Sequence, residues 1–127
     1  MVARRAIMYW SRLALVTLLL AGLAGCATTI GDITLRPEQY YQQKLTVRGR
    51  ITRRQDVGNE TVLEIADARE RRILVTSRTP VDQARGDWVA VTGVLVPEAR
   101  IGGQSLFDVI AAEAIEPARP PLLPNLF

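Results

Sequence analysis

The sequence predicts an all-β fold, in which five strands form a small closed sheet after an N-terminal signal helix. Three observations carry this prediction. Short segments rich in β-branched residues alternate apolar and polar positions, which is typical of half-buried strands. Clusters of turn-forming residues separate these segments. Two of the segments are interrupted by a glycine, which indicates strands that bend strongly, as a small closed sheet requires.

Residues 1–25 are predicted to be a signal peptide that is cleaved. Arg4 and Arg5 form a positive beginning, and a largely apolar run from Leu13 to Ala24 follows. A membrane-spanning helix needs about 20 apolar residues, so this run alone is too short to span. The alternative is a transmembrane anchor that starts near Ala6 and tolerates a charged residue within it.

The run ends in Leu23-Ala24-Gly25-Cys26, which resembles the lipobox of bacterial lipoproteins. The resemblance implies that Cys26 becomes the mature N-terminus and carries a diacylglycerol thioether, with acyl chains such as palmitate. Two or more chains anchor a protein stably, so the membrane is an expected partner through Cys26. The expected location is the bacterial cell envelope, facing the periplasm. Ala27 after the cysteine favours the outer over the inner membrane in a Gram-negative cell.

Composition limits the chemistry that the mature chain can perform. Cleavage after Gly25 would leave 102 of the 127 residues, enough for one small domain with a core. It would also leave 13 basic and 13 acidic residues, so the sequence pI of about 9.6 is no argument for nucleic acid. The chain has no histidine, and Cys26 is its one cysteine, which excludes imidazole metal sites and the common catalytic triads and dyads. We expect no enzyme activity, no metal site and no cofactor.

The segment before the first strand is expected to contain little regular structure. Residues 26–32 are predicted to be a lipidated tether, and residues 27–35 have no helical period and are expected to be extended. Pro37 suits the first turn of a helix, so one or two helical turns are predicted in residues 36–43. Tyr40 and Tyr41 are expected to pack on the sheet rather than to form a site.

The five strands are predicted at residues 44–54, 61–66, 71–76, 87–96 and 106–115. Gly49 in the first and Gly93 in the fourth mark bulges or bends. Pro97 is expected to end the fourth strand, and a loop at residues 97–105 is expected to follow. Four of the seven prolines lie in residues 117–127, which predicts an extended or disordered tail. One alternative function is a structural spacer whose Pro-rich tail docks on a partner.

Two stretches carry a resemblance to a known fold. Tyr41-Gln42-Gln43-Lys44-Leu45-Thr46-Val47-Arg48-Gly49-Arg50-Ile51 and Gly86-Asp87-Trp88-Val89-Ala90-Val91-Thr92-Gly93 resemble the beginnings of the first and fourth strands in small bacterial OB-fold domains. The resemblance covers about residues 33–116 and implies a five-stranded Greek-key barrel. It also implies a ligand surface across strands two and three, bordered by the loops at residues 55–60 and 97–105.

Basic residues near that surface are the candidate ligand-binding residues: Arg48, Arg50, Arg71 and Arg72. They suggest an anion site. The alternative is a solvated outer face on which the arginines are balanced by Asp56, Glu60, Glu64, Asp67 and Glu70.

Two considerations argue against nucleic acid as a partner. Strands two and three contain no aromatic residue for base stacking, and Trp88 and Phe107 are expected to lie in the core. A lipid-anchored domain outside the cytoplasm also meets little single-stranded nucleic acid. The favoured function is therefore a non-catalytic binding or adaptor module for another envelope protein, a glycan or a small molecule. The alternative is binding of single-stranded nucleic acid or another anionic polymer through the arginine-rich face.

Overall fold

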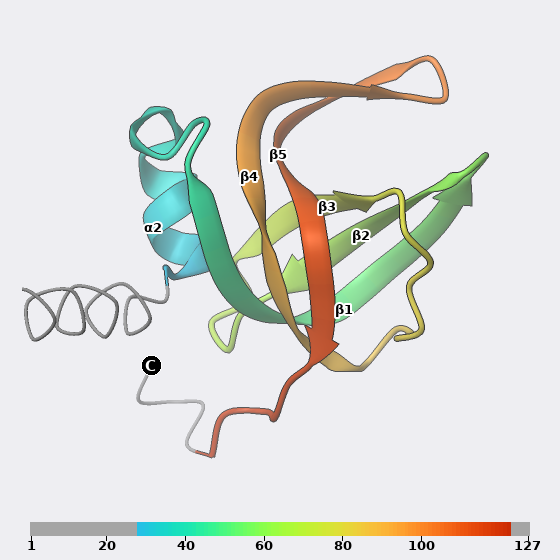
Figure 1. Cartoon of the computed structure of the whole chain (residues 1–127). Coiled ribbons are helices and arrows are strands. Elements are labelled where there is room, and N and C mark those ends of the chain that lie inside the picture. Colours follow the sequence, from blue (N-terminus) through green and yellow to red (C-terminus); the bar gives the residue numbers. More distant parts are fainter. Residues whose placement is uncertain (1–27, 123–127) are drawn as a thin grey trace, which may run out of the picture.

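The computed structural model describes residues 28–122 (Figure 1). The predicted signal peptide, Cys26 and the last five residues of the Pro-rich tail lie outside the described residues. The elements are α2 (Ile30–Leu35), the 3-10 helix η1 (Pro37–Gln39), β1 (Lys44–Val57), β2 (Glu60–Ala66), β3 (Arg72–Ser77), β4 (Trp88–Ile101) and β5 (Gln104–Pro117). Within residues 28–122, neither helix has the length and apolar character needed to cross a membrane.

The five strands close into a barrel in the order β1-β2-β3-β5-β4. The β3–β5 pair is parallel, and the other pairs are antiparallel. β1 belongs to both halves of the barrel, because its first half pairs with β4 and its second half with β2. A shift in register between Ile51 and Arg53 marks the change of partner. The predicted all-β, five-stranded Greek-key barrel is confirmed.

The glycines predicted to mark bends lie where neighbouring strands approach closely. A Cβ atom on Gly93 would lie 2.2 Å from the carbonyl oxygen of Ala111, and one on Gly49 would lie 3.0 Å from that of Ala66. The β4–β5 register shifts between Thr92 and Gly93, so a bulge lies where it was predicted. Both positions therefore need glycine because of the strand opposite.

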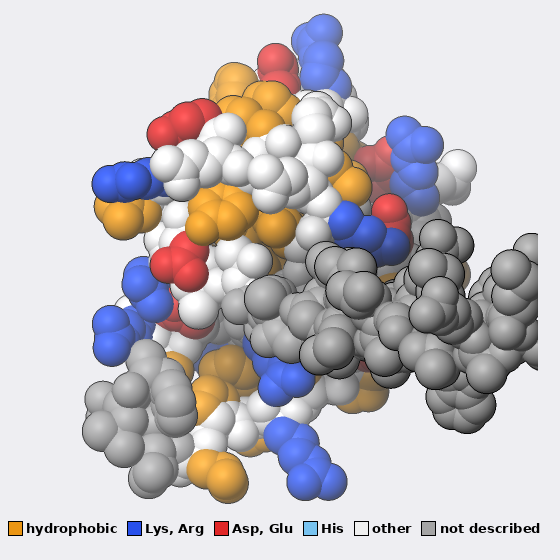
Figure 2. Space-filling model, turned by 60° about the vertical axis from the view of Figure 1, so that its left-hand side comes forward, with side chains coloured by type: hydrophobic (Ala, Val, Ile, Leu, Met, Phe, Trp, Pro, Cys, Tyr) orange, Lys and Arg blue, Asp and Glu red, His pale blue; other side chains and the backbone are white. Residues whose placement is uncertain are grey.

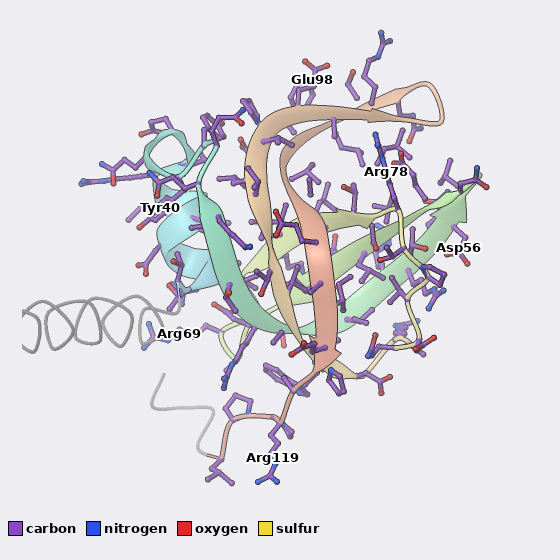
Figure 3. The ribbon with its side chains drawn as sticks, in the orientation of Figure 1. Tyr40, Asp56, Arg69, Arg78, Glu98 and Arg119 are labelled. Atoms are coloured by element: carbon purple, nitrogen blue, oxygen red, sulfur yellow. The ribbon has the colours of Figure 1, made fainter. Side chains whose placement is uncertain are left out.

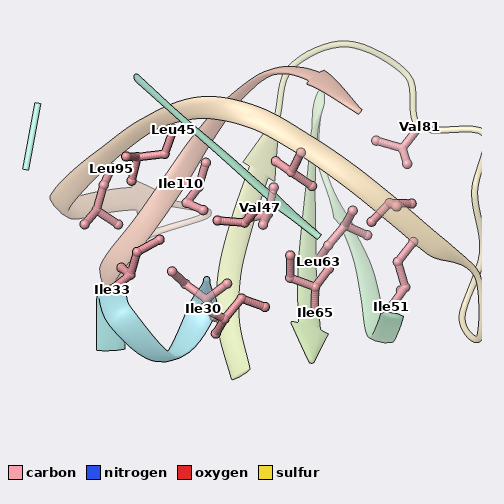
Figure 4. Packing of buried hydrophobic residues seen from close by; sticks show 14 residues of the cluster. Ile30, Ile33, Leu45, Val47, Ile51, Leu63, Ile65, Val81, Leu95 and Ile110 are labelled. Carbon is pink, nitrogen blue, oxygen red and sulfur yellow. The ribbon is translucent and has the colours of Figure 1, made fainter. Parts of the chain in front are cut away.

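The barrel interior is filled by alternate residues of every strand and is closed at one end by α2 (Figure 4). Ile30 and Ile33, three residues apart on one face of the helix, are fully buried. Thr29 caps the helix, since its side-chain oxygen accepts from the Asp32 amide at 3.1 Å. The expectation of an extended segment is wrong for residues 30–35, because a six-residue helix is too short to show a period in sequence. The folded domain also includes Ile30 and Gly31, which were expected in the tether.

The fourth and fifth strands form a longer hairpin than the sequence suggests. Pro97 lies within β4 and does not end it, and only Gly102 and Gly103 form the turn, with φ of 58° and 81°. Pro97 falls between the ladder pairs Val96–Val109 and Glu98–Phe107, so its missing N–H does not interrupt the strand. The predicted loop at residues 97–105 is therefore mostly an arm of strand that projects from the barrel (Figure 1).

Candidate functional site

A hollow of about 620 Å³ lies on the outer face of β1, β2 and β3. We call it the arginine hollow; it is lined by Arg50, Thr52, Arg53, Arg54, Glu64, Glu70, Arg72 and Arg85. Five arginines and two glutamates give it an excess of three positive charges. A concave, basic surface of this kind attracts polyanions and raises their local concentration.

The β1 residues of the hollow are placed by the end of the buried pattern in that strand. Up to Ile51, alternate β1 residues point into the core, and the residues between them point outward. Beyond the change of partner near Thr52, β1 buries no further side chain, so Arg53 and Arg54 are both exposed. The bulge thus allows adjacent arginines to lie on the outer surface.

Arg85 is brought to the hollow by the connection between β3 and β4. Arg54 donates from Nη1 to the carbonyl oxygens of Val81 and Gln83, at 2.8 Å in each case. The Gly86 amide donates to the carbonyl oxygen of Ile51 at 2.8 Å, and Val81 is buried in the core. These long-range bonds hold the connection against β1. Because no periodic pattern marks such bonds in a sequence, Arg85 was missed as a candidate.

Most of the arginines are neutralised by neighbouring carboxylates. Arg50 pairs with Glu70, and Arg72 with Glu64, each at 3.1 Å. The remaining acidic residues of the predicted balance also pair with arginines, in Arg54–Asp56, Arg71–Asp67 and Arg78–Glu60. For these five arginines, the alternative of a solvated outer face balanced by carboxylates is therefore right. Figure 3 labels Asp56 and Arg78, which belong to two of the pairs.

Arg53 and Arg85 differ from the other arginines of the hollow. The side chain of neither residue makes a hydrogen bond or an ion pair within residues 28–122. Both side chains are exposed. They are consequently the two cations of the hollow that can bind an incoming anion without first breaking an internal pair.

A second recess, of about 310 Å³, continues the arginine hollow toward the β4–β5 arm. We call it the phenylalanine recess; it is lined by Ile33, Thr34, Glu64, Arg72, Ile73, Leu74, Phe107 and Asp108. It shares Glu64 and Arg72 with the arginine hollow, so the two form one surface. Thr52 Oγ1 donates to Glu64 Oε1 at 2.9 Å, and that oxygen also accepts from Arg72. The hydrogen bond from Thr52 of β1 thus helps to fix the Glu64–Arg72 pair that the two recesses share.

Phe107 is 64% exposed, so the expectation that it lies in the core is wrong. It pairs with Glu98 on the projecting arm, beyond the barrel wall, whereas Val109 and Ile110 fill the interior. The aromatic side chain missing from β2 and β3 is therefore supplied by β5. Trp88 is half-buried on the outer face of β4, and it too lies outside the core cluster.

The four arginines proposed from the sequence do not form one site. Arg50 and Arg72 line the arginine hollow, whereas Arg48 and Arg71 line a separate recess beside Trp88. Arg71 is held by Asp67 at 2.8 Å and lies flat on α2, since a Cβ on Gly31 would be 1.9 Å from its Nη1. Arg48 and Arg50 both lie on the outer face of β1, but they line different recesses of it.

Tyr40 and Tyr41 pack against the core, as predicted (Figure 3 labels Tyr40). The Tyr41 hydroxyl donates a hydrogen bond to Asp108, which also lines the phenylalanine recess. This hydrogen bond is the main cause that raises the pKa of Tyr41 above its ordinary value of 10.0, and desolvation and the negative charge of Asp108 add to it. No group of three or more potential metal ligands occurs within residues 28–122.

No protein family model and no curated protein matches the sequence. Solved structures do. Asparaginyl-tRNA synthetase from Pyrococcus horikoshii matches with a TM-score of 0.56 and 17% identity, over 76% of this chain and 24% of that chain. The telomere capping protein Ten1 from Saccharomyces pombe matches with a TM-score of 0.55 and 15% identity, over 79% of this chain and 87% of that chain. OBody AM1L10, in complex with hen egg-white lysozyme, matches with a TM-score of 0.54 and 16% identity, over 72% of this chain and 92% of that chain.

The fold is an OB-fold. Identities of 15–17% establish the fold alone, and this chain spans about a quarter of the synthetase chain. The comparison nevertheless overturns the expectation that argued against nucleic acid, because domains of this shape occur in a telomere capping protein and a tRNA synthetase. One premise of that expectation also fails, since the exposed Phe107 lies beside the basic face.

Proposed function

We propose that this OB-fold domain is a non-catalytic module that binds single-stranded nucleic acid. The observation that carries the proposal is one continuous surface that presents Arg53 and Arg85, without internal partners, together with the exposed Phe107. Proteins that bind single strands combine a basic groove for the backbone with aromatic side chains for the bases. The similarity to Ten1 and to a tRNA synthetase supports the choice of ligand class.

The arginine hollow would contact the phosphate backbone. Arg53 and Arg85 would each bind a phosphate and release its condensed counterions, which makes the affinity depend on salt. Arg50 and Arg72 are already paired with glutamates. A phosphate contact by either of them would therefore add less binding free energy than one by Arg53 or Arg85. The arrangement selects for negative charge but does not by itself distinguish one polyanion from another.

Phe107 would supply the preference for nucleic acid over other polyanions. Its ring lies in a recess with Leu74 and Ile73, which offers an apolar surface for an unpaired base. Stacking on an aromatic side chain contributes about 1–3 kcal/mol per base and requires bases that are free of a duplex. A polyphosphate or an acidic glycan cannot make this contact.

We propose in addition that a lipid on Cys26 anchors the domain in the bacterial cell envelope, at the outer membrane in a Gram-negative cell. The support is the sequence Leu23-Ala24-Gly25-Cys26 after an apolar run. An anchored domain would present its basic surface to nucleic acid outside the cytoplasm. Cys26→Ser should prevent lipid labelling and release the protein from the membrane fraction; unchanged fractionation contradicts the anchor.

The binding proposal is tested by fluorescence anisotropy with a labelled oligothymidine of about 16 nucleotides, the upper site size of one OB-fold. The purified full chain should bind, and the logarithm of its affinity should fall linearly with the logarithm of the salt concentration. The double variant Arg53→Ala/Arg85→Ala should lower the magnitude of that slope by about 1.4, which corresponds to two lost phosphate contacts on a single strand.

The matched control is Arg36→Ala/Arg48→Ala, which removes two exposed arginines that lie outside the hollow and have no ion pair within residues 28–122. It has the same net charge as the test variant and should keep the wild-type slope. Equal slopes in the two double variants would show that the binding is not located in the hollow. Absence of binding at low salt would overturn the proposed function.

A further inference from the structure

We propose that the end of the barrel around Thr28 lies directly against the membrane, with Trp88 and Arg48 in contact with the lipid surface. This inference rests on the proposed lipid on Cys26 and adds an orientation to it. The surface involved is distinct from the arginine hollow. It is the recess that holds the other two arginines singled out in the sequence, Arg48 and Arg71.

The first step of the argument is the length of chain between the lipid and the fold. The Thr28 amide donates to the carbonyl oxygen of Thr46 in β1 at 3.2 Å, so the chain is bonded to the barrel from Thr28 onward. Thr29 caps α2, and Ile30 is buried. Ala27 is thus the one residue between Cys26 and the barrel. An extended chain spans at most about 3.6 Å per residue, so the Cα atom of Cys26 cannot lie more than about 7 Å from that of Thr28.

This short link restricts how the domain can be oriented. A tether over residues 26–32 would let the barrel turn freely above the bilayer. A link of two residue steps, joined to an ordered strand pair and a capped helix, holds the surroundings of Thr28 at the bilayer surface. Any side chain that shares a recess with Thr28 is therefore placed within reach of lipid headgroups.

The second step is the chemistry of that recess. It has a volume of about 210 Å³ and is lined by Thr28, Thr29, Ile30, Arg48, Asp67, Ala68, Arg71, Trp88 and Pro121. Trp88 offers an amphipathic ring of the kind that is enriched at membrane interfaces. Arg48 is exposed and has no ion pair within the described range, so it is available to a lipid phosphate.

Basic and hydrophobic side chains also lie around the recess. Leu122, which follows Pro121 in the chain, is 97% exposed. Figure 2 turns this side of the molecule forward and shows basic and hydrophobic side chains together over its lower part. Arg69 and Arg119 also lie in the lower half of Figure 3, whereas Glu98 lies at the top. A mixed basic and apolar surface next to a lipid anchor fits a bilayer that contains anionic lipid.

The orientation leaves the nucleic-acid surface open at its aromatic end. Trp88 is the first residue of β4, and Glu98, the ladder partner of Phe107, lies ten positions further along that strand. The projecting β4–β5 arm, with Phe107 on it, therefore points away from the end that meets the membrane (Figure 1). The same two positions provide a pair of reporter sites for a direct test.

The test uses tryptophan fluorescence, because Trp88 is the one tryptophan outside the predicted signal peptide. The lipid-modified protein, with cleavage and acylation confirmed by intact mass, is reconstituted in vesicles of phosphatidylcholine and phosphatidylglycerol. Half of the samples contain brominated acyl chains, which quench nearby tryptophan. Trp88 emission should be much weaker in the brominated vesicles than in the unbrominated ones.

The control is the double variant Trp88→Phe/Phe107→Trp, which moves the reporter to β5, opposite Glu98 on the projecting arm. Its emission should be the same in brominated and unbrominated vesicles. Protein that floats with the vesicles but shows no quenching at Trp88, or equal quenching at both positions, overturns the orientation while leaving the anchor intact. Protein that lacks the lipid and does not float overturns the anchor, and the orientation with it.

Discussion

At the scale of single residues, the surface is decided by which charges remain without a partner. Ten of the charged side chains around the β1–β3 face form five ion pairs with one another. Arg53 and Arg85 lie outside this set. Counting residues in the sequence predicted that acidic side chains would balance the arginines of this face. It could not predict which carboxylate pairs with which arginine. Arg85 depends on hydrogen bonds between residues more than 25 positions apart, such as Arg54 to Val81, which a local pattern does not record.

Phe107 is the residue whose substitution separates base stacking from charge. Phe107→Ala should weaken binding of oligothymidine by about 1–3 kcal/mol, the value of one stacked base. Since the ring is exposed, the thermal transition should change little. Anisotropy and a thermal melt measure the two effects. Leu35→Ala, which truncates another exposed hydrophobic side chain, is the control and should leave the affinity unchanged.

An unchanged affinity in Phe107→Ala would contradict the role of this ring. Binding of polyphosphate by the same variants completes the comparison. Polyphosphate has no bases, so Phe107→Ala should bind it as the wild type does.

Tyr41 should make the stability of the fold depend on pH in the alkaline range. Its hydrogen bond to Asp108 raises the pKa of the folded state above the ordinary value of 10.0. The folded protein therefore keeps this proton when the unfolded chain begins to lose it, and the stabilisation is lost as the pH rises from 10.0 through the raised pKa. Urea unfolding of the wild type and of Tyr41→Phe across this range should show a steeper decline for the wild type. Parallel declines would show that the hydrogen bond has no such effect.

At the scale of elements, regular strands could be predicted and short or irregular pieces could not. The alternation of Leu45, Val47 and Ile51 indicates β1 because every second residue is buried. α2 has six residues and buries two apolar side chains, which is too few to distinguish a helix from a coil in sequence. Pro97 indicated a strand end, although a proline between ladder pairs is compatible with a continuing strand.

The helix α2 contributes to stability through its buried face. Ile33→Ala should destabilise the domain by about 2–5 kcal/mol, because it leaves a cavity under the end of the barrel. Leu35→Ala, on the same helix but 78% exposed, should cost far less. The difference is measured by urea unfolding followed by circular dichroism. Similar costs for the two substitutions would mean that α2 does not close the core as described.

At the scale of the whole molecule, the barrel places two different surfaces at separate positions on β4 and its neighbours. The recess beside Thr28 and Trp88 lies where the chain joins the barrel, and the arginine hollow continues into the phenylalanine recess toward the projecting arm. The glycine-bent strands allowed the barrel to be predicted from sequence. The division of Arg48, Arg50, Arg71 and Arg72 between two surfaces could not be predicted, since it follows from how the strands curve.

The measurement that tests the central claim most directly is a map of amide chemical shifts in the ¹⁵N-labelled protein during titration with oligothymidine. Binding through the proposed surface should move the signals of Arg53, Arg72, Arg85 and Phe107, and should leave those of Thr28, Arg48 and Trp88 in place. Shifts that cluster around Thr28 and Trp88 instead, or an absence of shifts at low salt, would contradict the account.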